Sequence, residues 1–140
     1  MTPFQTYPWL SLPHAFLVAR VATAGFFMAH AIVRILNGTI PRFGQFMESL
    51  GFPAGVPLVW AITTVELVAG MMLIFRWRVL PATTALFAVA LGGVVLIHRN
   101  LGWFVGEHGS GGSEYSVALM VLLVLIAAYE TQSRRQNPSA

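Results

Sequence analysis

Glu66 is the residue that most constrains the fold of this chain, because it stands alone in a long apolar segment. The run from Val56 to Phe75, VPLVWAITTVELVAGMMLIF, carries no other charged residue. About 20 apolar residues, each rising about 1.5 Å along a helix, span the hydrocarbon core of a bilayer. An ionisable side chain near the middle of such a helix costs about 3 kcal/mol to insert and is tolerated where protein groups surround it. The segment therefore predicts a transmembrane helix with a buried polar site at Glu66.

Four apolar segments of this kind predict the fold class. They cover about residues 15–36, 57–75, 79–97 and 115–129, and only 9% of the 140 residues are charged. This composition excludes a soluble domain and leaves room for one domain of four spans, residues 1–140. Only Arg76, Trp77 and Arg78 join the second and third spans, so these spans are antiparallel neighbours. We predict an all-α protein, a membrane four-helix antiparallel bundle.

The connections between the spans also carry structural signals. After Pro41, apolar residues recur at the spacing of one helical face, with polar residues between them: Phe43, Phe46, Met47 and Leu50. This pattern predicts a short amphipathic helix between the first two spans, lying in the membrane interface or capping the bundle. The last connection, residues 101–116, combines many glycines with aromatic and ionisable side chains. We expect it to fold back onto the mouth of the bundle.

Arginine placement predicts the orientation. Four arginines share the side of the N-terminus: Arg76, Arg78, Arg134 and Arg135. Near the opposite side stand Arg34, Arg42 and Arg99. The positive-inside rule then places both termini in the cytoplasm of a bacterial-type cell, with the protein in its cytoplasmic membrane and in contact with lipid. The first fourteen residues carry no positive charge and the first span contains Arg20, which favours a retained helix over a cleaved signal peptide.

Two function classes are excluded by composition. The chain has no cysteine, so it forms no disulfide and offers no thiolate to a metal or to thiol–disulfide exchange. Its net charge of +3 is small and its arginines are scattered, so we predict no nucleic-acid partner.

Polar residues from all four spans are predicted to converge on the outer end of the bundle. The convergent residues are His30, Arg34, Glu66, His98, Arg99, Glu114 and Tyr115. Three residues of the last connection, Trp103, Glu107 and His108, are placed to close over them. The inner half offers only Arg20 of comparable character. The convergence predicts a site in the outer half, with His30 and Glu66 as candidate catalytic residues. The candidate ligand-binding residues are Arg34, His98, Trp103, Glu114 and Tyr115.

Each of these residues also has a purely structural interpretation. Glu66 can pair with Arg34 or Arg20 and lock two helices together, and His30 can be an ordinary core histidine. Arg20 can extend its guanidinium to the interface, and Tyr115 and Trp103 can be interfacial aromatics. His98 and Arg99 can complement the dipole of a helix C-terminus, and Glu114 that of an N-terminus. Glycines at four positions are expected to permit close helix approach: Gly25, Gly70, Gly92 and Gly93.

Metal and haem sites are not predicted. The histidines and glutamates form no tight ligand-spacing motif such as HExxH, and no paired-histidine motif for haem is present. No covalent cofactor is predicted either.

The order and type of several residues resemble the DoxX family of small four-helix membrane proteins over nearly the whole length. The first span carries Arg20, Gly25-Phe26, His30 and Arg34, and Gly51-Phe52-Pro53 follows. The second span has Glu66 and Gly70. Then come His98, Gly102-Trp103-Phe104 and Glu114-Tyr115. Two departures are Ala31, where many members have Gly, and Arg34, where Lys is commoner. The resemblance implies a membrane subunit associated with quinol oxidase or thiosulfate:quinone oxidoreductase, with links to redox stress. It also implies similarity to four-helix proteins that bind sterol-like ligands.

Three functions remain open at this point. The first is an oxidoreductase-associated subunit that handles a quinone or another lipophilic redox partner, with a soluble or membrane partner subunit and in some cases a homo-oligomer. The second is a non-enzymatic membrane module that binds a small lipophile or anchors a soluble redox enzyme. The third, a transporter or proton path, is the weakest because nothing polar continues to the inner face. Whether the chain is an enzyme is not decided by its sequence.

Overall fold

The computed structural model describes residues 10–97, 102–104 and 112–136, and within these ranges the regular structure is helical throughout. The helices are α1 (Leu12–Leu36), α2 (Ile40–Ser49), α3 (Gly55–Ile74), α4 (Val79–Leu96) and α5 (Glu114–Gln136). In the described part of the chain, α1, α3, α4 and α5 are each long and apolar enough to cross a membrane. The predicted all-α membrane bundle is therefore confirmed, with α2 as the short amphipathic helix between the first two spans.

The last helix extends beyond the apolar segment predicted as the fourth span. The fourth span was expected to end near Tyr129, but α5 continues to Gln136. Glu130 accepts a hydrogen bond from Arg134, four residues further on, at 3.0 Å. Residues four apart lie on one helical face, so this pair stabilises the extra turns. The apolar pattern ends before these turns, and hydrophobicity alone could not predict them.

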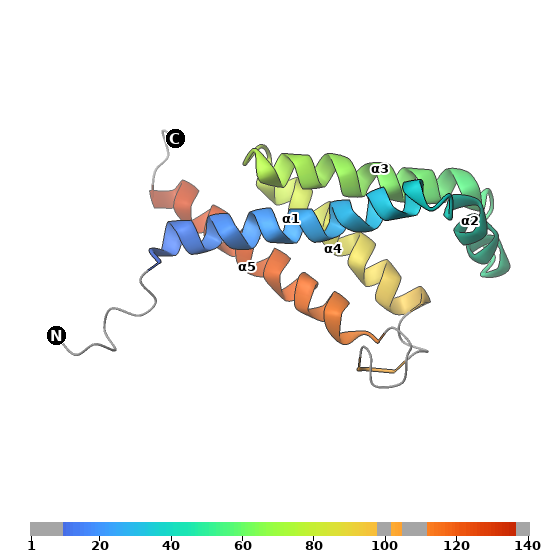
Figure 1. Ribbon diagram of the computed structural model, residues 1–140. Coiled ribbons are helices and arrows are strands. Elements are labelled where there is room, and N and C mark those ends of the chain that lie inside the picture. Colours follow the sequence, from blue (N-terminus) through green and yellow to red (C-terminus); the bar gives the residue numbers. More distant parts are fainter. Residues whose placement is uncertain (1–9, 98–101, 105–111, 137–140) are drawn as a thin grey trace.

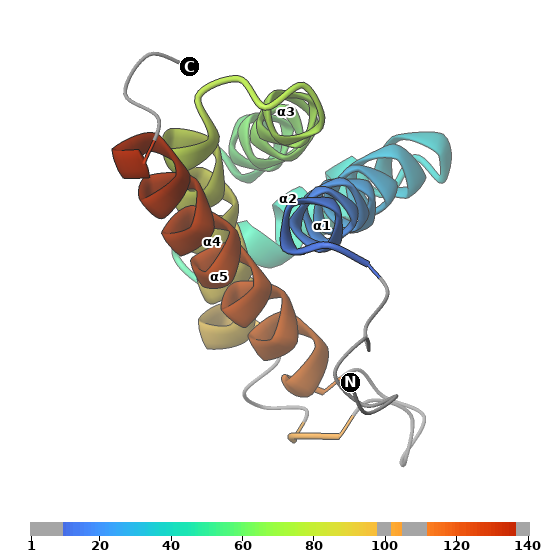
Figure 2. The same cartoon turned by 90° about the vertical axis from the view of Figure 1, so that its left-hand side faces the viewer.

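The four spans form a ring in chain order. Helix α1 packs on α3, α3 on α4, α4 on α5, and α5 returns to α1. An end-on view shows α3 and α1 on one side and the crossed pair α4 and α5 on the other (Figure 2). From the side, α1 and α3 run together, whereas α4 and α5 slant away from them towards the end that carries α2 (Figure 1). This divergence opens the bundle at one end.

The opposite end holds both ends of the described chain and is closed by side-chain contacts. The rings of Phe16 and Tyr129 stack with their centroids 4.1 Å apart, joining the start of α1 to the end of α5. Arg76, between α3 and α4, donates to Glu130 of α5 at 3.1 Å. The described N- and C-terminal ends and the α3–α4 turn therefore share one side, as four antiparallel spans require.

Three helices end in the same left-handed turn. The residue after the C-cap has a positive φ in each case: Gly38 (61°), Gly51 (90°) and Arg76 (55°). Paired backbone hydrogen bonds close each turn, for example Arg76 N–H to Leu73 O and Trp77 N–H to Met72 O. These bonds satisfy carbonyls that the helix itself leaves unpaired. Glycine adopts the left-handed conformation without strain, but arginine does not. Arg76 is held there by tertiary contacts.

Helix α2 is fixed against the start of α3 by two glycines and a carboxylate. A Cβ at Gly55 would collide with the backbone carbonyl of Gly44, and one at Gly44 would lie 2.6 Å from Val56. Glu48 accepts a hydrogen bond from the Gly55 N–H at 3.0 Å and so satisfies one of the unpaired donors of α3. Ile40, Met47 and Val59 bury their side chains between the two helices.

Most of the apolar surface of the spans faces outward. Only 22% to 33% of the residues in the most apolar stretch of each span are buried in the bundle. The interior consists mainly of small and branched side chains, among them Ala24, Ala69, Leu86 and Leu123. The remaining apolar side chains form a lipid-facing surface, which identifies an integral membrane protein.

Four glycines of the spans were expected to permit close helix approach. The structure shows this at Gly70 but not at Gly25 or Gly92. A Cβ at Gly70 would lie 2.5 Å from Met28 Cγ, well inside van der Waals contact distance, so α3 and α1 approach closely there. A Cβ at Gly25 or Gly92 would meet nothing within 4 Å. Gly25 faces outward, whereas Gly92 and its neighbour Gly93 line a cavity. Sequence spacing alone could not distinguish these environments.

Replacing Gly55 by alanine is expected to destabilise the protein by about 1–3 kcal/mol, the usual cost of overpacking. The added methyl group would push against the Gly44 backbone, which cannot rotate away. Thermal unfolding of the detergent-solubilised protein measures the effect. Gly25→Ala is the matched control and should leave stability unchanged or raised by up to about 1 kcal/mol. Equal melting temperatures for the two variants would contradict the close approach of α2 and α3.

Cysteine labelling tests the predicted orientation, because the chain has no cysteine of its own. Gln136 and Gln45 are exposed at opposite ends of the bundle. In intact cells, a membrane-impermeant maleimide should label Gln45→Cys and should label Gln136→Cys only after permeabilisation. The reverse pattern would place both termini outside.

Candidate functional site

A cavity of about 600 Å³ occupies the space where α4 and α5 diverge from α1 and α3. All five helices contribute to this central cavity. It is lined by Phe27, His30 and Arg34 of α1, Phe43 and Met47 of α2, Ile62 and Glu66 of α3, residues 88–90, 92, 93, 96 and 97 of the α4 end, and Gly112, Tyr115, Ser116 and Leu119 around the start of α5. Its lining is mostly apolar, and its charged groups come from α1 and α3. Concave apolar sites with a few convergent polar groups typically bind small molecules.

An ion pair joins Arg34 of α1 to Glu66 of α3. The Arg34 Nη1 atom lies 2.7 Å from Glu66 Oε2 and 2.8 Å from Thr63 Oγ1. The Thr63 hydroxyl donates to the Val59 carbonyl at 2.7 Å, so its lone pair is free to accept from Arg34. The Glu66 side chain is 5% exposed and that of Arg34 15%. A buried carboxylate is stable where a guanidinium neutralises it with direct hydrogen bonds.

The pair lies at different depths in its two helices. Glu66 is near the middle of α3, whereas Arg34 is two residues from the end of α1. The guanidinium carbon of Arg34 also lies 5.4 Å from the centre of the Phe43 ring of α2. Arg34 therefore reaches inward from the end of α1 and contacts both α2 and α3.

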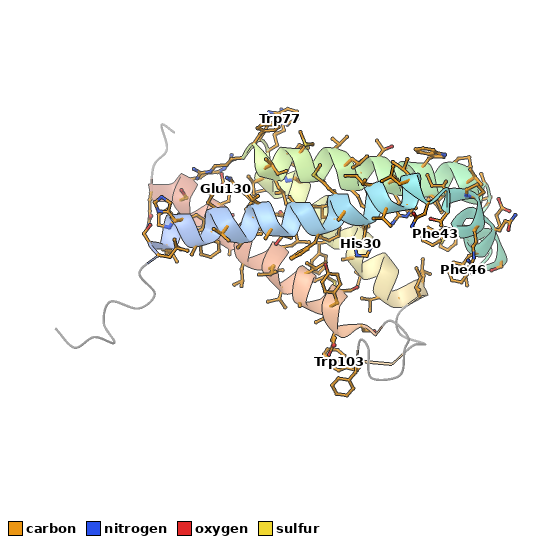
Figure 3. The ribbon with its side chains drawn as sticks, viewed as in Figure 1. His30, Phe43, Phe46, Trp77, Trp103 and Glu130 are labelled. Carbon is orange, nitrogen blue, oxygen red and sulfur yellow. The ribbon has the colours of Figure 1, made fainter. Side chains whose placement is uncertain are left out.

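His30 stands one helical turn before Arg34 and lines the same cavity. Its ring centroid lies 6.2 Å from that of Tyr115, at the start of α5. Figure 3 shows His30 below α1, on the side where α4 and α5 diverge, with Phe43 further along towards α2. His30 and Tyr115 are both partly open to the surroundings. They place an imidazole and a phenol next to each other in the lining of the cavity.

Four of the seven residues that the α4 end contributes to the cavity lining are small. Ala88, Ala90, Gly92 and Gly93 of α4 line the central cavity. Since a Cβ at Gly92 would meet nothing within 4 Å, side-chain space at this position is empty. The volume of the cavity therefore depends on missing side chains in α4.

The structure brings four of the predicted site residues together, namely His30, Arg34, Glu66 and Tyr115. Trp103 is not part of the cavity lining; its side chain is 54% exposed and points away from the bundle (Figure 3). Glu114 begins α5 beside Tyr115 but does not line the cavity. Trp60 of α3 is exposed and is not part of the cavity lining either. His98, Arg99, Glu107 and His108 lie outside the described residues.

The last connection folds back on itself at its two ends. Ser113 N–H donates to Gly102 O at 3.1 Å and Glu114 N–H to Trp103 O at 3.0 Å. Gly112 lies so close to the backbone of residues 103 and 104 that no Cβ could be placed there. Residues 102–104 are thereby anchored to the start of α5, at the edge of the central cavity.

A second polar cluster, at the opposite end of the bundle, was missed by the sequence analysis. Glu130 is buried and accepts hydrogen bonds from Arg76 and Arg134, and Arg20 lies within electrostatic reach of it. The inner half therefore holds more than Arg20, contrary to expectation. The available signal was a glutamate directly after an apolar span, followed by two arginines. A charge at a helix end is ordinary, so this signal is weak.

Metal ligands do not gather in the described part of the chain. Residues 10–97, 102–104 and 112–136 contain no group of three histidine, aspartate or glutamate side chains close enough to hold a metal ion. The charged and hydrogen-bonding side chains that line the central cavity include Arg34, Glu66, His30 and Tyr115.

The four spans, the docked α2 and the polar site inside an apolar bundle define a small four-helix integral membrane protein. The sequence matches the DoxX family over residues 15–99, which is more than half of the chain. The protein therefore belongs to the DoxX family. No curated protein and no solved structure shows significant similarity to it.

Replacing Glu66 by glutamine is expected to destabilise the protein by about 3 kcal/mol, because the Arg34 charge would remain in the bundle without its carboxylate. The double variant Arg34→Met with Glu66→Gln removes that charge and should regain most of the loss. Thermal unfolding in detergent compares the single and double variants. If Glu66→Gln melted like the wild type, the ion pair would contribute nothing to the joining of α1 and α3.

Proposed function

We propose that this DoxX protein is an oxidoreductase-associated membrane subunit that binds a quinone or a similar lipophilic redox partner in the central cavity. The observation that carries this proposal is the distribution of chemistry around the cavity. Its volume of about 600 Å³ lies within the usual range for small-molecule sites, about 300–1,000 Å³. Its polar groups belong to α1, α3 and α5, and α4 presents a wall of small apolar residues.

A quinone suits such a cavity on chemical grounds. Its carbonyl oxygens accept hydrogen bonds, and its ring and isoprenoid tail are apolar. His30 and Tyr115 can donate to a carbonyl oxygen, and the Arg34 guanidinium stabilises negative charge on the ligand. Phe27 and Leu119 contribute apolar lining for the ring and tail. The partly open positions of His30 and Tyr115 favour entry of a ligand that is dissolved in the bilayer.

The proposed proton chemistry uses His30 and Glu66. His30 is the group best placed to give a proton to a carbonyl oxygen, because its ring borders the cavity and faces Tyr115. Glu66 interacts electrostatically with His30 and is held in place by its hydrogen bond from Arg34. The sequence carries no recognisable flavin or haem motif. The proposal therefore includes a partner subunit or a bound substrate as the source of electrons.

One observation favours a second candidate, a non-enzymatic module that holds a lipophile or anchors a soluble redox enzyme. The Arg34–Glu66–Thr63 network is complete within the protein and joins α1 to α3. In this alternative the network serves only to hold the helices, and ligand binding needs only the apolar part of the central cavity.

Lipid extraction of gently purified protein, followed by mass spectrometry, tests the proposal. The wild type should retain a quinone, and His30→Ala should lower the retained amount about fivefold, as expected for one lost hydrogen bond. Gly92→Leu should remove the quinone, because its side chain would occupy the empty wall of the cavity.

Gly25→Leu is the matched control, since it adds the same side chain to a span but outside the cavity. It should retain quinone like the wild type. A wild type that carried only bulk phospholipid would contradict the quinone proposal. Quinone retained by wild type and His30→Ala alike, but lost from Gly92→Leu, would favour the non-enzymatic module.

A further inference from the structure

The second polar cluster borders a cavity of its own. This basic pocket has a volume of about 240 Å³ and lies where α1 begins, α5 ends and the α3–α4 turn passes between them. The residues that matter here are Arg20, Arg76, Tyr129 and Glu130, which all line it. It shares no lining residue with the central cavity. Its volume is several times the roughly 30 Å³ that a water molecule occupies, so a small ligand group fits.

The charges in the basic pocket do not balance. Glu130 uses one carboxylate oxygen for Arg76, at 3.1 Å, and the other for Arg134, at 3.0 Å. Arg20 also interacts electrostatically with Arg76 and Glu130. Three guanidinium groups therefore surround a single carboxylate. One carboxylate balances only one of the three positive charges, so the remaining positive charge attracts an anion.

Arg20 carries a hydrogen-bond donor that the described chain leaves unused. Its Nε atom is buried and has no hydrogen-bond partner among the described residues. Arg76, by contrast, uses Nε for Glu130 and Nη2 for Ser133. Buried donors are nearly always paired, so the Nε atom of Arg20 calls for a partner beyond the described residues.

The acidic residues of the chain cannot supply the missing charge from the described segments. Glu48, Glu66 and Glu114 belong to the opposite half of the bundle, and Glu107 lies outside the described residues. Residues 1–9 and 137–140 contain no acidic side chain. Among the described residues, no acidic side chain other than Glu130 therefore neutralises Arg20, and an anion from outside the chain can take that place.

The position of the basic pocket narrows the kind of anion. It lies at the ends of the spans, where the headgroups of a bilayer begin. A guanidinium matches a phosphate group with two parallel hydrogen bonds, and it does so better than an ammonium. The stacked rings of Phe16 and Tyr129 border the charged groups with apolar surface.

We propose that the basic pocket formed by Arg20, Arg76 and Glu130 binds a phosphate group, either that of a lipid headgroup or inorganic phosphate. Arg20 and Arg76, which both line the pocket, supply the guanidinium groups that would pair with the phosphate. Glu130 holds Arg76 in place and limits the pocket to a ligand that can pair with two guanidinium groups.

Binding to the purified full-length chain in a neutral detergent tests this assignment. The probes are inorganic phosphate, dihexanoyl phosphatidylglycerol and, as an uncharged blank, dihexanoylglycerol. Arg20→Gln should weaken phosphate or phosphatidylglycerol binding by about tenfold or more, as expected for a lost charge-assisted hydrogen bond. Arg78→Gln is the matched control, because it removes the same charge from the same end without touching the pocket. It should bind like the wild type.

The two charged probes distinguish the source of the phosphate. Binding of phosphatidylglycerol without inorganic phosphate assigns the pocket to a lipid headgroup, and binding of both shows that the phosphate group suffices. Absence of binding for both probes, or equal weakening by Arg20→Gln and Arg78→Gln, overturns the proposal. If Arg20→Gln failed to fold, Arg20→Lys would replace it, since the charge is kept and the paired geometry is lost. Quinone retention should be unchanged in Arg20→Gln. The test of the phosphate site is therefore independent of the test of the quinone site.

Discussion

The ion pair between Arg34 and Glu66 is the interaction on which the membrane-embedded part of this protein depends. An isolated carboxylate in the middle of α3 would oppose insertion, and an isolated guanidinium would have to leave the bundle for the interface. Together, and with Thr63, they cancel charge and fix the register of α1 against α3. Because the ion pair joins α1 to α3, and α2 packs against the start of α3, this half of the bundle stays together where α4 and α5 diverge from it. The central cavity lies in the space that this divergence leaves.

The two ends of the bundle solve the same electrostatic problem in different ways. Each end buries one glutamate and neutralises it with an arginine from outside the helix of that glutamate: Arg34 of α1 for Glu66, and Arg76 of the α3–α4 turn for Glu130. At the α2 end the charges are matched one to one, and the adjoining cavity is large and mostly apolar. At the opposite end arginines outnumber the carboxylate, and the adjoining pocket is small. The protein thus has two cavities of different character, one large and mostly apolar and the other small and bordered by arginines.

Much of the fold could be predicted from the sequence, because apolar length and helical spacing are direct consequences of a bilayer. The four spans, the amphipathic α2 and the meeting of His30, Arg34, Glu66 and Tyr115 followed from depth along each helix. The features that could not be predicted depend on the direction in which each residue faces around its helix, rather than on its depth along the helix. Gly70 meets another helix and Gly92 meets empty space, although both are glycines in apolar spans. Trp103 points outward. In the sequence Glu130 resembles an ordinary charge at a helix end, because its proximity to Arg20 and Arg76 arises only from the fold.

The left-handed conformation of Arg76 links the order of synthesis to the completion of the fold. Arg76 ends α3 in a conformation that glycine would adopt more readily, and its side chain is held by Glu130, 54 residues later in the chain. The turn between α3 and α4 therefore lacks its stabilising partner until the last helix has left the ribosome. The α3–α4 turn is then stabilised by a residue that is synthesised after it. A chain truncated before Glu130 would therefore lack the side-chain contact that holds Arg76.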